Sequence, residues 1–132
     1  MEKNTEQLAY VNKAIVRGFI EEVWAAGKTE RISDYVAPVY VAHALRSKVD
    51  VVGIEGVANN AVGTRKRFPD LDVEIRDMVA DDDRVACYVI LKSHPDGEAQ
   101  QDIKEEMVIF KLRNRLLTEC WSIGTDWEAP RK

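Results

Sequence analysis

The spacing of apolar residues changes midway along the chain, and this change limits the possible folds more than any other feature. Between residues 5 and 26, apolar side chains recur every three or four positions, as on one face of an amphipathic helix. Over residues 72–76 they alternate with charged residues, which is the repeat of a sheet with one solvent-exposed face. Helices followed by strands predict an α+β fold, in which a strongly curved, mainly antiparallel sheet packs on three N-terminal helices.

The first half of the chain contains two further helical patterns. A short helix is expected over residues 29–35, closed by Pro38, because proline lacks the amide hydrogen that a helix needs. A longer helix is expected over residues 54–68. Between the two, residues 39–42 are expected to form a short strand and residues 47–53 a loop.

The second half of the chain contains the remaining strands. Residues 85–91 are apolar at every position, so we expect a central strand that is covered on both faces. Asp96-Gly97 is typical of a tight hairpin turn, and two more strands are expected over residues 103–112 and 116–123. The sequence contains no repeat or linker, so residues 1–132 are expected to form one domain.

Composition narrows the choice of partners. The 132 residues include 19 Lys and Arg against 23 Asp and Glu, which gives a formal net charge of -4. Proteins that bind nucleic acid or anionic membranes usually carry a basic surplus, so neither partner is expected. No apolar run is long enough to span a membrane, and the first residues, MEKNTEQ, lack the pattern of a secretion signal. A cytoplasmic location is therefore expected.

The residue types that bind metals are few and scattered. Cys87 and Cys120 lie in apolar, strand-like runs, where we expect buried reduced thiols rather than a disulfide or a zinc site. His43 and His94 are far apart in sequence and have no Cys or Asp at ligand spacing. The three aspartates at residues 81–83 are expected to form a polar turn. We therefore expect no metal site.

Several short segments occur in an order and spacing that resemble one known family. They are residues 16–24 (VRGFIEEVW), 40–43 (YVAH), 53–57 (GIEGV), 68–71 (FPDL), 83–85 (DRV), 110–112 (FKL) and 119–121 (ECW). Together they resemble the SnoaL-like polyketide cyclases, within the nuclear transport factor 2-like superfamily. The resemblance implies a cystatin-like α+β cone, a fold that hosts cyclases, isomerases and non-catalytic binders alike.

The resemblance also implies a chemistry. In these cyclases a carboxylate or a His moves protons beside a ketone in a deep apolar cone, without a cofactor, and so promotes intramolecular aldol ring closure. Burial raises the pKa of a carboxyl group in such a pocket, which suits an acid–base catalyst. The implied ligand is a hydrophobic small molecule. A homodimer is expected from the family analogy and from apolar residues on both sides of the C-terminal strands.

The sequence departs from the family pattern at the position of the expected acid. Val108 stands where these cyclases commonly carry an Asp, and Cys120 and Ser122 replace a His and an Asp in the closing motif. Glu106 lies two residues before Val108, so its side chain shares a strand face with Val108 and it is the best candidate for a general base. If this end of the strand is frayed, Glu106 is an ordinary solvated charge.

Other candidate site residues are less specific. His43 follows an apolar strand where the family often has a pocket-lining His, and it is expected either to assist proton transfer or to bond to backbone at a loop junction. Six residues are candidates for substrate contact: Trp24, Tyr40, Tyr88, Val108, Phe110 and Trp121. The Tyr88 hydroxyl needs a partner and is a candidate donor to a ligand carbonyl, although packing on the sheet explains this aromatic residue equally simply.

Three functions are compatible with these residues. The first is a cofactor-independent acid–base enzyme that acts on a hydrophobic carbonyl compound through Glu106 and His43. The second is a non-catalytic small-molecule binding protein that has lost the acid at Val108. The third is a dimerisation module whose cone is filled by its own side chains. An open cavity with ionisable groups in its wall favours the first function, and a filled cone favours the third.

Overall fold

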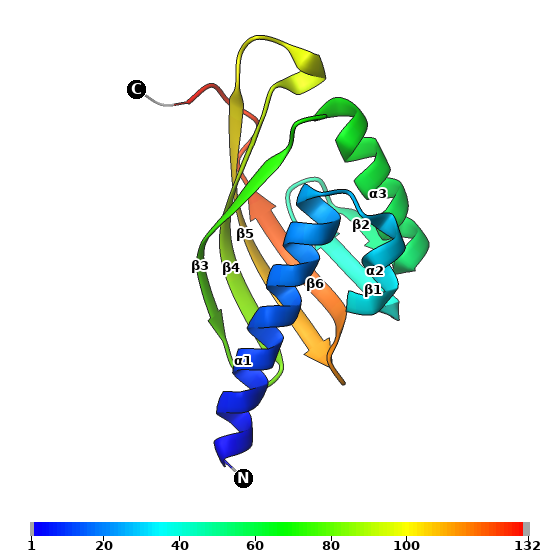
Figure 1. The fold of residues 1–132 in the computed structure, drawn as a ribbon, viewed down its shortest axis with the longest axis vertical. Helices are drawn as coiled ribbons and strands as arrows, with labels where there is room; N and C mark the ends of the chain where they lie inside the picture. The colour runs from blue at the N-terminus through cyan, green and yellow to red at the C-terminus, as the bar shows by residue number, and fades with distance from the viewer. Residues whose placement is uncertain (1, 131–132) are drawn as a thin grey trace.

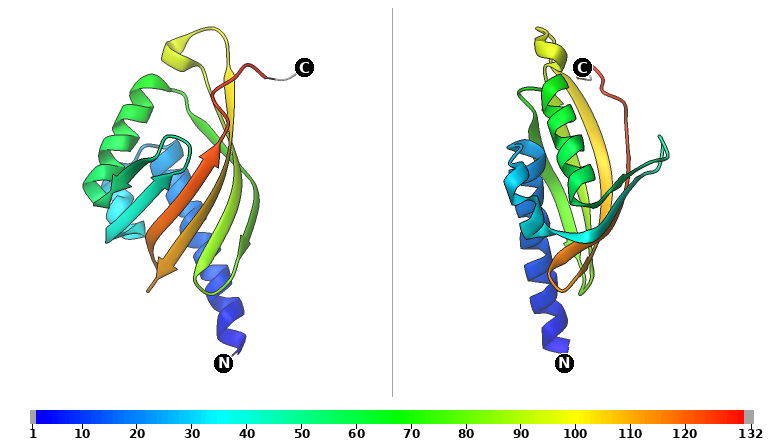
Figure 2. Two further views of the ribbon diagram at one scale, coloured as in Figure 1. Left: turned by 180° about the vertical axis from the view of Figure 1, so that it is seen from behind. Right: turned by 90° about the vertical axis from the view of Figure 1, so that its right-hand side faces the viewer.

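In a computed structural model of the chain, which describes residues 2–130 and side chains from residue 5, helices and strands form two layers (Figure 1). The helices all lie on one side of a single twisted sheet, as the two further views in Figure 2 show. The α+β fold predicted from the change in apolar spacing is confirmed. None of the helices between residues 2 and 130 is long and apolar enough to cross a membrane.

The helices lie close to their expected positions. They are α1 (Glu2–Phe19), a π-helical turn (Ile20–Ala25), a 3-10 turn (Thr29–Arg31), α2 (Ile32–Tyr35) and α3 (Gly53–Arg67). The first helix begins before Thr5, and the third ends just before Phe68. Their apolar faces pack against the sheet, where Val16, Phe19 and Ile20 are fully buried.

Six strands form the sheet. They are β1 (Val36–Ala44), β2 (Val49–Val52), β3 (Asp72–Ala80), β4 (Arg84–Ser93), β5 (Asp102–Arg113) and β6 (Leu116–Gly124). Their order across the sheet is β2-β1-β6-β5-β4-β3. Within the described residues, β1 and β6 run parallel and the other neighbouring pairs are antiparallel. The mainly antiparallel sheet and the strands expected over residues 103–112 and 116–123 are confirmed.

The first two strands differ from expectation. Residues 47–53 do not form a loop throughout, because β2 pairs antiparallel with β1. Pro38 follows the end of α2, as expected, but it lies inside β1. The pairing of β1 with β6 is interrupted between Val36 and Val41. This interruption accommodates Pro38, because proline has no amide hydrogen to donate to a neighbouring strand.

Strand β4 is central but not fully covered. It pairs with β3 on one side and with β5 on the other. Its inward side chains, including Val85 and Val89, are fully buried. Ala86 and Tyr88 on the outer face are only half-buried. Ile90, on the same outer face, is buried. The expectation of cover on both faces therefore holds only in part, because the helices occupy only one side of the sheet.

The π-helical turn after α1 sets which side chains face the sheet. Its hydrogen bonds join residues five apart, as from the Ala26 amide to the Glu21 carbonyl at 3.1 Å. Phe19 and Trp24, also five apart, therefore lie on the same side, with ring centroids 6.0 Å apart. Both rings also contact Phe110 of β5. The turn thus brings an additional aromatic side chain to the inner face of the sheet.

Candidate functional site

A cavity of about 350 Å³ lies between the inner face of the sheet and the helices α1 and α3. Its wall is mostly apolar and comes from the end of α1, from α3, and from strands β1, β2, β4, β5 and β6. The cone is therefore not filled by the side chains of the protein. A cavity of this size falls in the range of sites that hold one small molecule.

Glu106 is the one carboxyl group among the described residues that line this cavity. It lies in β5 opposite Val89 of β4 and Gly124 of β6. Its side chain is half-buried and has no hydrogen bond or salt bridge to any residue between 2 and 130. Burial raises the pKa of Glu106 above its ordinary value, and the nearby Lys104 ammonium opposes this rise. Glu106 is thus an ionisable group that is free to act on a ligand.

Gly124 leaves room for the Glu106 side chain. A Cβ atom at position 124 would lie 2.6 Å from the Glu105 carbonyl oxygen and 3.2 Å from Glu106 Cγ. Real Cβ atoms do not approach a backbone oxygen so closely, so a larger residue at position 124 would displace β5. The absence of a side chain here lets β5 and β6 stay paired while Glu106 points into the cavity.

Lys104 lies two residues before Glu106 and lines the same cavity. Its ammonium donates a hydrogen bond to the Thr125 carbonyl oxygen at 2.6 Å. Thr125 is in turn fixed to β5, because its amide donates to the Glu105 carbonyl and its hydroxyl accepts from the Glu105 amide. The segment after β6 therefore holds the Lys104 side chain in place.

The same C-terminal segment completes the cavity wall. Ile103 and Glu128 exchange two backbone hydrogen bonds, which hold this segment against β5. The Trp127 ring stacks on the Phe68 ring just after α3, with centroids 4.3 Å apart, and it lines the cavity. The segment therefore joins β5 to the end of α3 at the cavity.

Tyr40 and Cys120 form a second polar pair in the wall. The Tyr40 hydroxyl donates to the Cys120 sulfur at 3.1 Å, and both residues are buried. Burial raises the pKa of Tyr40, and it raises the pKa of the Cys120 thiol to about 11. Both groups are therefore neutral near pH 7. A thiol sulfur is a weak acceptor, so the Tyr40 hydroxyl can turn to a ligand oxygen instead.

The structure brings some of the predicted substrate-contact residues together. Trp24, Tyr40 and Val108 line the cavity. Phe110 does not: it is fully buried behind the wall, where its ring packs against Phe19 and Trp24. Its place in the core corrects the expectation that it contacts substrate.

His43, Tyr88 and Trp121 lie outside the cavity, which corrects their expected place in its wall. Each is on the outer face of the sheet, because alternate residues of a strand point to opposite faces. The His43 ring stacks on the Trp121 ring, and its two nitrogens contact Glu119 at 2.7 Å and Asp50 at 3.0 Å. The Tyr88 hydroxyl donates to the Glu105 carboxylate. These contacts occupy the polar groups that were candidates for ligand binding.

Several cavity residues were not identified from the sequence. The alternation that places Glu106 on the inner face also predicts that Lys104 lies on that face. A Lys near the end of a strand is usually solvated, however, so the sequence does not single it out as a site residue. The remaining polar groups in the wall are Asn60 and Thr64 from α3 and Ser122 from β6. Their spacing in the sequence carries no signal, because α3 and β6 meet only in the folded chain.

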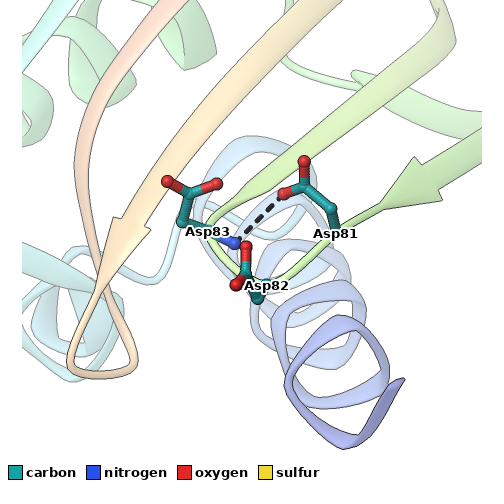
Figure 3. A group of neighbouring side chains, drawn as sticks. All are labelled: Asp81, Asp82 and Asp83. Atoms are coloured by element: carbon teal, nitrogen blue, oxygen red, sulfur yellow. Dashed lines mark hydrogen bonds between the residues drawn. The ribbon is translucent and has the colours of Figure 1, made fainter. Parts of the chain in front are cut away.

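The three aspartates at residues 81–83 form the expected polar turn between β3 and β4 (Figure 3). The Asp81 carboxylate accepts hydrogen bonds from the Asp83 and Arg84 amides at 3.1 and 2.8 Å. The Asn12 side chain donates to the Asp82 carbonyl and so attaches this turn to α1. The Arg84 guanidinium also pairs with the Asp81 and Asp83 carboxylates, at 3.2 and 3.6 Å, so backbone amides and this side chain account for the clustering of the carboxylates.

His94 lies in a hydrogen-bonded group next to the β4–β5 connection. The Asp70 carboxylate accepts bonds from the Ser93 hydroxyl, the His94 amide and His94 Nδ1. These hydrogen bonds lower the pKa of Asp70 well below its ordinary value. None of the three residues lines the cavity. Asp70 therefore joins the end of α3 to the end of β4.

Comparison with known proteins identifies the family. The model of the SnoaL-like polyketide cyclase family matches residues 14–123. The chain belongs to this family. The match covers the end of α1, all of α2 and α3, and every residue that lines the cavity, including Glu106, except Trp127. No match was found among curated proteins.

Solved structures with the same fold include other SnoaL-like proteins. A candidate polyketide cyclase from Acidithiobacillus ferrooxidans is 23% identical, with a TM-score of 0.77 over 88% of this chain and 89% of that chain. A candidate SnoaL-like polyketide cyclase from Jannaschia sp. CCS1 is 20% identical, with a TM-score of 0.78 over 89% and 87%. A candidate ketosteroid isomerase from Kribbella flavida is 12% identical, with a TM-score of 0.75 over 94% and 84%. At these identities the likeness shows the fold, a nuclear transport factor 2-like cone, and not the reaction.

Proposed function

We propose that this SnoaL-like chain is a cofactor-independent acid–base enzyme, of cyclase or isomerase type, that acts on a hydrophobic carbonyl compound. The observation that carries the proposal is Glu106, a carboxyl group in the wall of an apolar cavity with no hydrogen bond or salt bridge to the described side chains. Family membership supports a cyclase-like or isomerase-like role. His43 has no part in the proposal, because its side chain lies on the other face of the sheet.

The proposed reaction starts with proton transfer to Glu106. The ionised carboxylate removes a proton from the carbon next to a ketone, and the electron pair of that C–H bond moves toward the carbonyl oxygen to give an enolate. The enolate carbon then attacks a second carbonyl of the same molecule and forms the C–C bond. Protonated Glu106 returns the proton to the new alkoxide oxygen. A carboxyl whose pKa is raised by burial suits both steps.

The first step can be tested without knowing the natural substrate. The ketone 2-tetralone is incubated with the protein in deuterated water, and deuterium at its α carbons is measured by mass spectrometry. The wild-type protein is expected to accelerate exchange. Glu106→Gln keeps the size of the side chain but removes the base, so we expect exchange to fall by about 100-fold or more. Unchanged exchange in Glu106→Gln would remove this residue from the mechanism.

A matched control is available on the same strand. Glu105→Gln makes the same chemical change one residue away, on the outer face of β5, and is expected to exchange 2-tetralone like the wild type. Circular dichroism and thermal melting of both variants check that they fold.

One observation favours a second function, a non-catalytic binding protein. Val108 is fully buried in the cavity wall, at the position where the family commonly carries an acid. If 2-tetralone raises the melting temperature but wild-type protein does not accelerate exchange, the binding function replaces the enzymatic one.

A further inference from the structure

Lys104 is the one cationic group among the described residues that line the cavity. The wall around it is otherwise apolar or neutral, apart from Glu106. Lysine is rarely placed against an apolar cavity, because removing an ammonium group from water is unfavourable. Its presence there points to an interaction that favours a positive charge in this position.

The hydrogen bonding of Lys104 leaves it ready for a ligand. An ammonium group has three N–H donors, and one of them is used by the Thr125 carbonyl oxygen. Lys104 and Glu106 form no salt bridge, although they share a strand face and their Cα atoms are about 7 Å apart by strand geometry. Two N–H donors of Lys104 therefore have no partner among residues 2–130.

Three charged side chains, Glu106, Arg46 and Asp126, lie around this ammonium. Glu106 faces it from the same strand without a salt bridge, and burial raises the pKa of Glu106. Cys120 of β6 is a neutral thiol near pH 7. Lys104 and Glu106 also line an adjoining cleft, where Arg46 binds the Gly124 carbonyl at 2.7 Å and Asp126 at 3.4 Å. The positive charge of Lys104 therefore lies at the wall of the cavity, where a ligand oxygen can approach it.

From this geometry we infer that Lys104 is the binding site for a negatively charged ligand oxygen, the enolate oxygen in the reaction proposed above. The inference rests on the proposed function and adds a substrate class: ketones that can place the carbonyl oxygen at Lys104 while the α carbon meets Glu106. As Glu106 takes the α proton, the electron pair of the C–H bond forms the C=C bond of the enolate. The carbonyl π pair moves onto the oxygen, where the ammonium stabilises it.

The probe is 4-nitrophenol, whose phenolate carries its charge on an oxygen bonded to a planar carbon, as an enolate does. Its anion is yellow and its neutral form is colourless, so absorbance reports the protonation state of the bound molecule. An opposite charge within contact distance lowers the pKa of an acid by about one unit or more. We expect the apparent pKa of bound 4-nitrophenol to be at least about one unit lower in the wild type than in Lys104→Met.

Two further variants separate charge from structure. Lys104→Gln keeps an N–H donor for the Thr125 carbonyl but removes the charge, and it is expected to leave the pKa of the bound phenol as high as in Lys104→Met, which would not follow if Lys104 only held the Thr125 segment in place. Lys111→Met removes a Lys from the exposed face of the same strand and is expected to leave that pKa unchanged. Titrations of folded protein, checked by circular dichroism, provide the comparison.

The outcomes distinguish this inference from the proposed function. Equal pKa values in wild type and Lys104→Met, or no binding of 4-nitrophenol to the wild type, overturn the Lys104 site whatever the deuterium exchange shows. If the phenol pKa depends on Lys104 but 2-tetralone does not exchange, the enzymatic proposal fails and Lys104 stands as an anion site in a binding protein.

Discussion

The protonation of Glu106 couples the cavity to the stability of the fold. Burial raises the pKa of this carboxyl in the folded state, so folded protein binds the proton more tightly than unfolded protein does. Stability from this group is therefore present at low pH and is lost as the pH rises above 4.5, the ordinary value for Glu, through the raised folded value. A carboxylate in an apolar wall thus destabilises the protein as the pH rises above the range in which this group is protonated.

Glu106→Gln is expected to raise the melting temperature above the titration range of Glu106 and to leave it unchanged below pH 4.5. The reason is that Gln has no charged form to desolvate. Thermal unfolding measured across pH checks this. A variant that melts at the same temperature as the wild type at every pH would contradict the raised pKa.

The contrast between Glu106 and His43 shows how far single residues can be placed from the sequence. Glu106 shares its face with Val108 and Phe110, so these large apolar neighbours indicate which face is buried. His43 stands between Ala42 and Ala44, and residues on both sides of it give no such indication. The strand pattern therefore located Glu106 at the cavity, whereas the pocket-wall expectation for His43 came from the family resemblance and placed the side chain on the wrong face.

At the scale of elements, His43 joins three strands on the outer face of the sheet. Its nitrogens contact Glu119 of β6 and Asp50 of β2, while His43 itself lies in β1. The hydrogen bond with Glu119 and then that with Asp50 raise the pKa of His43 above 6.5. The protonated ring therefore holds the β1–β2 hairpin to β6, and Val49 and Val51 of this hairpin line the cavity.

His43→Gln is expected to melt at a lower temperature than the wild type below pH 6.5, with the difference disappearing as the pH rises through the folded pKa of His43. The sign follows because the folded state binds this proton more tightly. Melting curves across pH measure it, and salt should weaken the difference because the groups are partly exposed. A difference that persists at alkaline pH would point to lost packing on Trp121 instead.

Helices and strands in which apolar residues recur at regular spacing were predicted from the sequence. Elements that depend on tertiary contacts were not. α3 and the last two strands lie within a residue or so of their expected positions, because each carries a full period of buried side chains. β2 was missed since a strand of four mostly exposed residues has no period to detect. The π-helical turn was missed because Phe19 and Val23 alone fit an ordinary helix.

At the scale of the whole molecule, the outer face of the sheet carries an exposed apolar surface. Met107 and Ile109 of β5 are about half exposed, as is Ile123 of β6, and Trp121 lies beside them. No helix covers this face between residues 2 and 130 (Figure 2). A surface of this kind is typical of an interface, and we propose that a second copy of the chain covers it.

Ile109→Lys is expected to convert a homodimer to a monomer, because it places a charge in the centre of this surface. Light scattering coupled to gel filtration measures the mass of wild type and variant over a range of concentrations. Val62→Lys, an equally exposed position on α3, serves as control and is expected to leave the mass unchanged. A wild-type protein that is monomeric at every concentration would contradict the proposal.

The parallel pairing of β1 with β6 determines when the molecule can assemble during synthesis. β6 (Leu116–Gly124) separates β1 from the rest of the sheet, so the hairpin of β1 and β2 has no neighbouring strand until β6 has been made. On the ribosome, the chain from the end of β2 (Val52) to the end of β6 (Gly124), about seventy further residues, must therefore be made before that hairpin can pair with β6. A ribosome stalled before residue 116 would carry a chain with two separate pieces of sheet and no enclosed hollow, and its apolar edges would be open to chaperones.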